Sequence, residues 1–135
     1  MFLLDTVILS ELRKRERHPG LVSWMATQRT SDLFVSVVTI GEIQRGIDLQ
    51  RSKDAGFAAA LADWLDRVLT SYRDRLLGFD LGASRRWGRL SAELGHHSAD
   101  LMIAATALEH GLIVVTRNVR HFQPTGVQVW DPFQT

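Results

Sequence analysis

Short apolar runs alternate along this chain with stretches in which apolar residues recur every three or four positions. The runs predict buried strands at residues 2–4, 33–36, 76–79, 112–115 and 127–129. The periodic stretches predict amphipathic helices at residues 7–14, 21–25, 39–51, 55–75, 81–94 and 98–110. Strands that alternate with helices indicate a parallel sheet covered on both faces. We therefore expect an α/β protein in which one domain fills residues 1–135.

The composition excludes several classes of site. The 135 residues include no cysteine, which removes disulfide scaffolds, zinc–thiolate sites and cysteine nucleophiles. The first five residues lack the basic and long apolar regions of a signal peptide, and no stretch reaches the roughly 20 apolar residues that span a bilayer. We expect a cytoplasmic protein without a membrane partner.

The basic residues are almost all arginines. Net charge is only +1, so the whole chain gives no general signal for nucleic acid. Among the 16 basic residues, however, only Lys14 and Lys53 are lysines. The guanidinium of arginine can donate two parallel hydrogen bonds to a phosphate, which the ammonium group of lysine cannot do. A compositional bias of the source genome toward arginine explains the same observation, and both interpretations stay open.

Three acidic residues lie where the predicted strands end. Asp5 directly follows the first strand, Glu42 is expected in the first turn of the helix after the second strand, and Asp100 is expected in the first turn of the helix before the fourth strand. Ligands of open α/β sheets gather beyond the carboxyl ends of the strands. We therefore expect these three side chains to meet at one rim of the sheet.

Such a cluster suits a hard divalent cation. Mg²⁺ prefers oxygen ligands, and two such ions activate water and stabilise the leaving oxygen of a phosphodiester. Acids near helix N-termini are also expected to have lowered pKa values. Each acid has a structural alternative: Asp5 as a helix cap, Thr39-x-x-Glu42 as a capping box, and Asp100 as a helix-dipole acid. Their shared rim favours the metal site.

The residues around these acids resemble those of PIN-domain ribonucleases, in particular the VapC toxins of toxin–antitoxin pairs. Four segments carry the resemblance, namely residues 3–11 (LLDTVILSE), 38–47 (VTIGEIQRGI), 100–107 (DLMIAATA) and 116–122 (TRNVRHF). The likeness extends over residues 1–132 in the family's order and spacing.

The resemblance implies a three-layer α/β/α sandwich with a central, mostly parallel sheet. It implies an endoribonuclease that depends on Mg²⁺ or Mn²⁺, in which Asp5, Glu42 and Asp100 are the catalytic, metal-binding acids. It also implies an RNA target such as tRNA or ribosomal RNA, a small VapB-like antitoxin as partner, and a homodimer.

Two positions depart from the family pattern. The family commonly has Asn after the Asp-Thr pair, where this chain has Val7. Such an Asn does not bind the metal itself but contacts Asp5 and supports it. The fourth segment often supplies another acid, where this chain has Asn118 and His121. Asn118 is a neutral ligand for a metal or its water, so we expect a second ion to bind weakly. His121 is either a phosphate contact or a half-buried surface histidine beside Phe122.

Other residues are candidates for supporting roles. The hydroxyls of Thr6 and Thr116 are placed to hold a ligating acid, although a strand-end cap also accounts for Thr116. Arg117 and Arg120 flank the fourth segment as phosphate contacts or as partners in exposed ion pairs.

Arg13 and Arg15 belong to a basic cluster after the first helix. The cluster either contacts RNA or is simply a charged face exposed to solvent. The pair His96-His97 is expected in a loop. Trp24, Trp64 and Trp87 lie on apolar stripes and are expected in the core or an interface.

Two functional hypotheses follow. The first is a VapC-like toxin, a metal-dependent endoribonuclease. The alternative keeps the fold without efficient chemistry, as a catalytically weak PIN-like RNA-binding or regulatory module, and Val7 and Asn118 support it. A receiver domain of the flavodoxin type is disfavoured, since it needs paired acids after the first strand and Asp5 stands alone.

Overall fold

A computed structural model describes residues 1–134, in which five parallel strands form one sheet. The strands are β1 (Phe2–Leu4), β2 (Leu33–Ser36), β3 (Leu76–Leu77), β4 (Ile113–Val115) and β5 (Val129–Trp130). Their order across the sheet is β3-β2-β1-β4-β5, and every neighbouring pair is parallel. Leu4 lies opposite Val115, so β1 and β4 end together.

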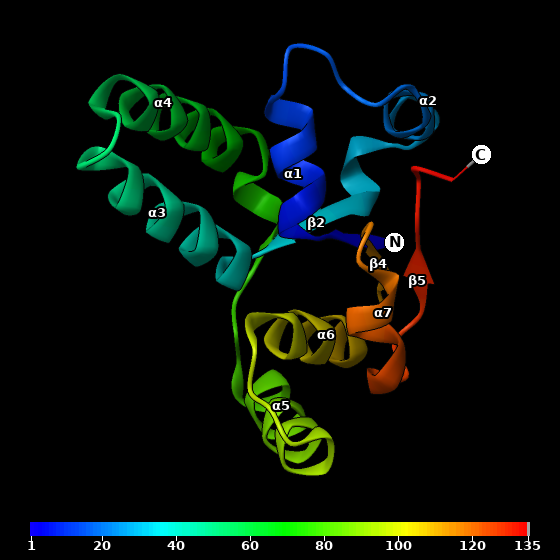
Figure 1. Cartoon of the computed structure of the whole chain (residues 1–135). Coiled ribbons are helices and arrows are strands. Elements are labelled where there is room, and N and C mark those ends of the chain that lie inside the picture. The colour runs from blue at the N-terminus through cyan, green and yellow to red at the C-terminus, as the bar shows by residue number, and fades with distance from the viewer. Residues whose placement is uncertain (135) are drawn as a thin grey trace.

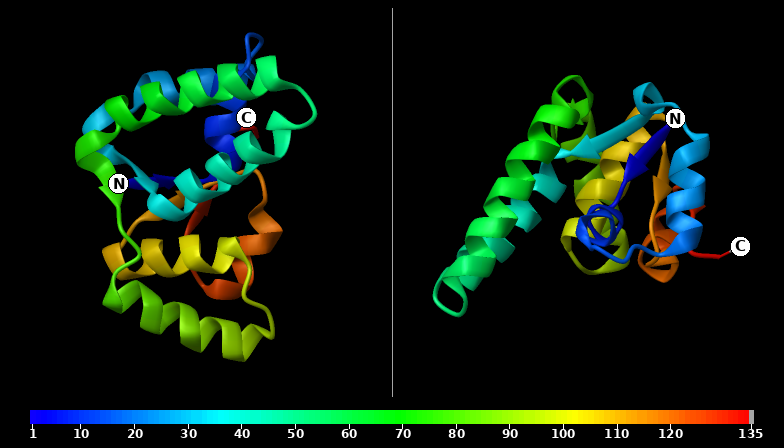
Figure 2. Two further views of the ribbon diagram at one scale, coloured as in Figure 1. Left: turned by 90° about the vertical axis from the view of Figure 1, so that its left-hand side faces the viewer. Right: turned by 90° about the horizontal axis from the view of Figure 1, so that it is seen from above.

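Helices cover both faces of this sheet (Figures 1 and 2). They are α1 (Thr6–Arg13), α2 (Pro19–Thr27), α3 (Val37–Arg51), α4 (Ala55–Ser71), α5 (Leu81–Leu94), α6 (Ala99–His110) and the short α7 (Val119–Phe122). The first four lie on one face, whereas α6 and α7 pack on the other with α5 outside α6. The predicted three-layer α/β/α sandwich is therefore confirmed. None of the helices in residues 1–134 combines the length and the apolar character needed to cross a bilayer.

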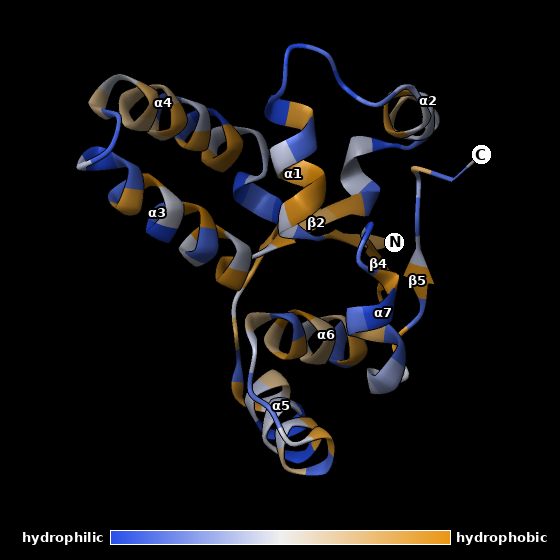
Figure 3. Ribbon diagram, in the orientation of Figure 1, coloured by the Kyte–Doolittle hydropathy of each residue, from blue (hydrophilic) through white to orange (hydrophobic). Residues whose placement is uncertain are grey.

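Alternation along β1 divides the core into two halves. Leu3 and Leu4 are both fully buried, but they point to opposite faces. Leu4 packs with Ile8 and Ile47 under the first four helices, and Leu3 packs with Phe122 on the α6 side. In Figure 3 the ribbon of β2 is coloured as apolar, whereas α1 and α3 carry both apolar and polar residues along their length. Each buried leucine contributes about 2 kcal/mol, so this division fixes which face each helix covers.

The start of α3 differs from the prediction. The helix begins at Val37, and the hydroxyl of Ser36 caps it by accepting a hydrogen bond from the amide of Val38 at 3.0 Å. Thr39 is inside the helix, so the alternative interpretation of Thr39-x-x-Glu42 as a capping box is wrong. Glu42 consequently lies in the second turn of α3 and not in the first.

Other helix ends agree with the prediction to different degrees. Gly95 and Gly111 end α5 and α6 with φ of +77° and +66°, the left-handed conformation that glycine adopts without strain. By contrast, α4 ends at Ser71, earlier than expected, and a 3₁₀ turn follows over Arg73–Arg75. The expected turn at residues 18–20 is also shorter, because α2 already begins at Pro19.

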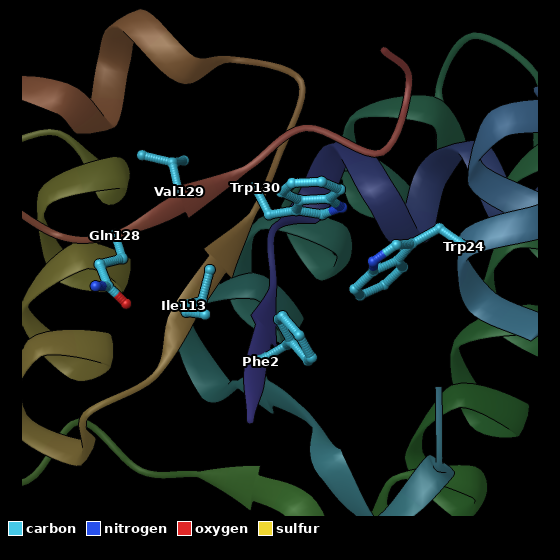
Figure 4. Close-up of a pocket in the computed structure, with 6 residues that line it drawn as sticks. All are labelled: Phe2, Trp24, Ile113, Gln128, Val129 and Trp130. Carbon is cyan, nitrogen blue, oxygen red and sulfur yellow. The ribbon is translucent and has the colours of Figure 1, made fainter. Parts of the chain in front are cut away.

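The sheet is partly uncovered along β5. A cavity of about 550 Å³ separates β5 from α2 and is lined by Phe2, Trp24, Ile113, Gln128, Val129 and Trp130. Figure 4 shows the rings of Trp24 and Trp130 on either side of it. Trp24 packs edge-to-face on Phe2 with ring centres 5.0 Å apart. Its ring therefore contacts the core and also lines the cavity.

Candidate active site

The course of the chain places a crevice beyond the ends of β1 and β4. The chain runs outward from β1 to β3 on one side and then returns across the sheet to β4 beside β1. Open α/β sheets bind ligands at such a reversal of strand order. The amide of Asp5 donates to the carbonyl of Val115 at 3.0 Å, which ties the residue after β1 to the end of β4. Asp5 and Thr116 therefore face each other across this reversal.

Asp5 is held from two directions. Its side chain is almost fully buried, with 2% of the residue exposed. Oδ1 accepts from the amide of Thr6 at 2.8 Å, and Oδ2 accepts from the hydroxyl of Thr116 at 2.8 Å. The hydroxyl of Thr116 in turn accepts from the amide of Asn118 at 2.9 Å, which leaves its proton for Asp5. This chain of hydrogen bonds fixes the orientation of the carboxylate.

Burial raises the pKa of Asp5 to about 6. The hydrogen bonds from Thr116 and Thr6 act in the opposite direction, while the charges of Asp100 and Glu42 raise the pKa further. The expectation of a lowered pKa is therefore wrong for Asp5. The interaction of a carboxylate with a helix N-terminus is smaller here than the loss of solvation. The charges of Asp100 and Glu42 are the smallest contributions, and they place both carboxylates near enough to Asp5 to act on it.

Thr6 holds the second acid. Its hydroxyl donates to Oε1 of Glu42 at 2.6 Å and lies 3.2 Å from the hydroxyl of Thr39. Thr39 is fully buried and was not recognised as part of the site from the sequence. The signal was present in the spacing, because Thr39 and Glu42 are three residues apart and share one face of α3.

The third acid has a histidine as its neighbour. Nδ1 of His121 lies 2.9 Å from Oδ2 of Asp100, whose side chain is 24% exposed. His121 is exposed, so the alternative of a half-buried surface histidine beside Phe122 is wrong. Asn118 precedes α7, and its side chain makes no capping hydrogen bond there.

The donor atoms at this rim suit Mg²⁺ or Mn²⁺. All three acids offer carboxylate oxygens. A cation beside Asp5 would offset the burial that chiefly raises the pKa of Asp5, and also the smaller repulsion from Asp100 and Glu42. Within residues 1–134, no three His, Cys, Asp or Glu side chains already stand in a ligating arrangement. Glu42 and Asp100 are instead turned toward Thr6 and His121. The residues fit the metal by chemistry and by electrostatic coupling.

The arginines are distributed unevenly around the rim. Arg13 packs over the ring of Phe57 at 5.4 Å and lines the same cavity as Thr6 and Glu42. Arg117 packs over the ring of Phe133 at 4.5 Å, beside Thr6 on the other side of α1. Arg15 is exposed in the loop after α1 and is not brought to the acids.

Arg120 lies in a separate cavity next to Asp100. The cavity measures about 350 Å³ and is lined by His96, Ser98, Asp100, Arg120, His121 and Pro124. His96 belongs to the loop between α5 and α6, as predicted, but it also forms one wall of this cavity.

Val7 does not leave the first acid without support. Its side chain packs against the core beneath the first four helices. Both oxygens of Asp5 already receive hydrogen bonds from Thr6 and Thr116. An Asn in place of Val7 is therefore not needed to orient Asp5 in this chain.

Comparison with known proteins identifies the family. The model of the PIN domain matches residues 2–126. This chain belongs to the PIN domain family. As a PIN domain it is 33% identical over 141 positions to "VapC ribonuclease Y4jK" of Sinorhizobium fredii, covering 99% of each chain. It is 31% identical over 143 positions to "Plasmid stability protein StbB" of Pseudomonas syringae pv. tomato, again covering 99% of each.

A solved structure shows the same PIN fold over the full length. The chain matches one in the crystal structure of FitAcB from Neisseria gonorrhoeae with a TM-score of 0.86 and 28% identity, covering 100% of both chains. The predicted family is thus confirmed, and so is the fold that the resemblance implied.

Proposed function

We propose that this PIN domain, as a single unit over residues 1–135, is a metal-dependent endoribonuclease and the toxin of a toxin–antitoxin pair. One observation carries the proposal: Asp5 is buried at the reversal between β1 and β4, where burial chiefly raises its pKa to about 6 and the nearby charges of Asp100 and Glu42 add smaller contributions. A cluster of coupled acids in a crevice is typical of a catalytic site. The relative named a VapC ribonuclease supports the reaction class.

Asp5, Glu42 and Asp100 would hold Mg²⁺ or Mn²⁺. When bound, the cation supplies Lewis-acid stabilisation of a phosphodiester and lowers the pKa of water. The chain's own residues prepare this site: Thr116 keeps the buried carboxylate of Asp5 in place, and Thr6 does so for Glu42. His121 restrains Asp100 through the contact at 2.9 Å.

Arginine side chains would bind the RNA backbone. Arg117 and Arg120 are exposed near the fourth segment, and phosphate contacts of this kind position a substrate without reading its bases. Arg13 lies closer to Glu42, whereas Arg15 would contact only RNA that extends beyond α1. The family resemblance suggests tRNA or ribosomal RNA, and an enzyme with such a target works in the cytoplasm.

A groove beside Glu42 is suited to an antitoxin. It is formed by α1, α3 and α4, measures about 260 Å³, and is lined by Thr6, Ser10, Arg13, Glu42, Ile43, Gly46, Gln50, Phe57, Leu61 and Trp64. Phe57 at its edge is 38% exposed. An apolar side chain of a partner peptide would fit this space, and the peptide would then obstruct access to Glu42. The VapB-like partner and the homodimer themselves rest on the resemblance.

Cleavage of RNA tests the proposal. Purified protein is incubated with total tRNA and Mn²⁺, and the products are resolved by electrophoresis. We expect wild-type protein to cut the tRNA, Asp5→Asn to lose this activity, and the control Asp63→Asn to retain it, because Asp63 is exposed on α4. Wild-type protein that binds tRNA without cutting it would instead support the RNA-binding or regulatory module.

A further inference from the structure

We propose that the cavity beside Asp100 is a subsite for a phosphate and ribose of the RNA backbone next to the bond that is cut. The inference rests on the proposed ribonuclease function and adds to it a place where the substrate is held. The cavity lies between the start of α6, the loop before it, and α7. Its volume of about 350 Å³ exceeds that of a lone phosphate and accommodates the attached sugar.

The walls of this cavity carry donors for an anion. Arg120 is exposed, and among residues 1–134 no carboxylate lies within ion-pair distance of its guanidinium. The hydroxyl of Ser98 lines the cavity, and it does not accept a capping hydrogen bond from the amides of α6. It offers one O–H donor to an anion. His96, from the loop before α6, also lines the cavity. Arginine and hydroxyl donors of this kind are the usual contacts of backbone phosphate.

Asp100 also lines this cavity, but it does not form an ion pair with Arg120. Asp100 is paired with Nδ1 of His121 at 2.9 Å, so its carboxylate already has a partner. The cavity therefore presents a cation that has no ion-pair partner among residues 1–134, directly beside a proposed catalytic acid.

The acidic rim where RNA would be cut creates the need for a nearby cation. RNA is a polyanion, and the rim where it would be cut holds three acids that repel it. The net charge of the chain is only +1, so general attraction does not offset this repulsion. A local cation next to Asp100 would anchor the strand where it enters the acidic rim. Arg117, by comparison, stacks on Phe133 and lies beside α1.

Binding of total tRNA to protein that cannot cut it provides the test. Asp5→Asn serves as the background, and anisotropy of labelled tRNA is measured with Mg²⁺ over a range of salt concentrations. Arg120→Gln is compared with Arg85→Gln, which removes the same charge from an exposed position on α5.

We expect Arg120→Gln to weaken binding about fivefold and to reduce the slope of log affinity against log salt by about 0.7–0.9, the loss of one phosphate contact. His96→Asn should weaken binding by a smaller factor.

Two outcomes separate this inference from the proposed function. Equal affinity and equal salt slope for Arg120→Gln and Arg85→Gln would overturn the subsite, even if the otherwise unmutated protein cuts tRNA. A reduced slope confined to Arg120→Gln would uphold the subsite even if that protein cuts nothing. In a protein that cuts, Arg120→Gln should raise KM about fivefold and leave kcat nearly unchanged.

Discussion

Replacement of Asp5 by Asn should stabilise the metal-free protein at neutral pH. The pKa of Asp5 is about 6 in the folded protein and about 3.9 in an unfolded chain. The folded state therefore keeps its proton to higher pH, and stability falls as pH rises from about 4 to about 6. At about 1.4 kcal/mol for each pH unit, the ionised carboxylate costs the fold about 3 kcal/mol above pH 6.

Asn at this position removes the charge and keeps the shape. Exchange of a carboxylate for an amide disturbs the hydrogen bonds from Thr6 and Thr116, at a cost of about 1 kcal/mol. The net gain expected at pH 7.5 is about 2 kcal/mol, or roughly 8 °C in Tm for a domain of this size. By pH 4 the gain should disappear, because Asp5 is protonated in the folded protein. Urea unfolding in EDTA at pH 4 and pH 7.5 measures both values.

A second buried acid provides a control of opposite sign. Glu11 is 8% exposed and accepts hydrogen bonds from Nζ of Lys14 and the amide of His18, both at 3.0 Å. The hydrogen bond from Lys14 is the main cause that holds the pKa of Glu11 below its usual value. Glu11→Gln should therefore destabilise the protein at pH 7.5, a change of opposite sign to that expected for Asp5→Asn. If Asp5→Asn is also less stable than wild type at pH 7.5, the reasoning about Asp5 is refuted.

Three further changes have defined outcomes. Affinity for Mn²⁺ should fall as pH drops below about 6, since Asp5 must lose its proton to bind a cation; calorimetry at pH 5 and pH 7.5 checks this, and equal affinities would contradict it. Thr116→Val should raise the pKa of Asp5 further and destabilise the fold by about 1–2 kcal/mol, because it removes the hydroxyl between Asp5 and Asn118; an unchanged carboxyl titration by NMR would count against that role. Phe122→Ala should cost about 3–5 kcal/mol in urea unfolding, as this ring is fully buried under the sheet; a loss below 1 kcal/mol would show that the core is not packed as described.

The fold was predictable because the spacing of apolar residues indicates the strands and helices, and because the residues at the strand ends mark where the site lies. Alternation of strands and helices indicated the parallel sheet, and Asp5 and Thr116 directly follow strands that the structure places side by side. The start of α3 was missed for a physical reason. Ser36 stands within a run of β-branched and aromatic residues from Phe34 to Val38, so the propensity for a strand concealed the cap.

The electrostatics of the site were beyond the sequence pattern. The sign of the pKa change at Asp5 depends on how completely α1, β4 and the neighbouring acids exclude water, which only packing determines. The contact between His121 and Asp100 likewise joins two residues that are 21 positions apart in the chain, and it depends on how α7 meets α6. Neither feature has a local signal in the chain.

The claim that one cation is shared by acids from three parts of the chain is tested most directly by calorimetric titration with Mn²⁺ at pH 7.5. Wild-type protein and Asp63→Asn should bind with the same affinity. Asp100→Ala and Glu42→Gln should each weaken binding about tenfold or more, as loss of a ligand or its neighbour does. Equal binding by wild type and Asp100→Ala would contradict a shared site, and the ribonuclease mechanism built on it would fall.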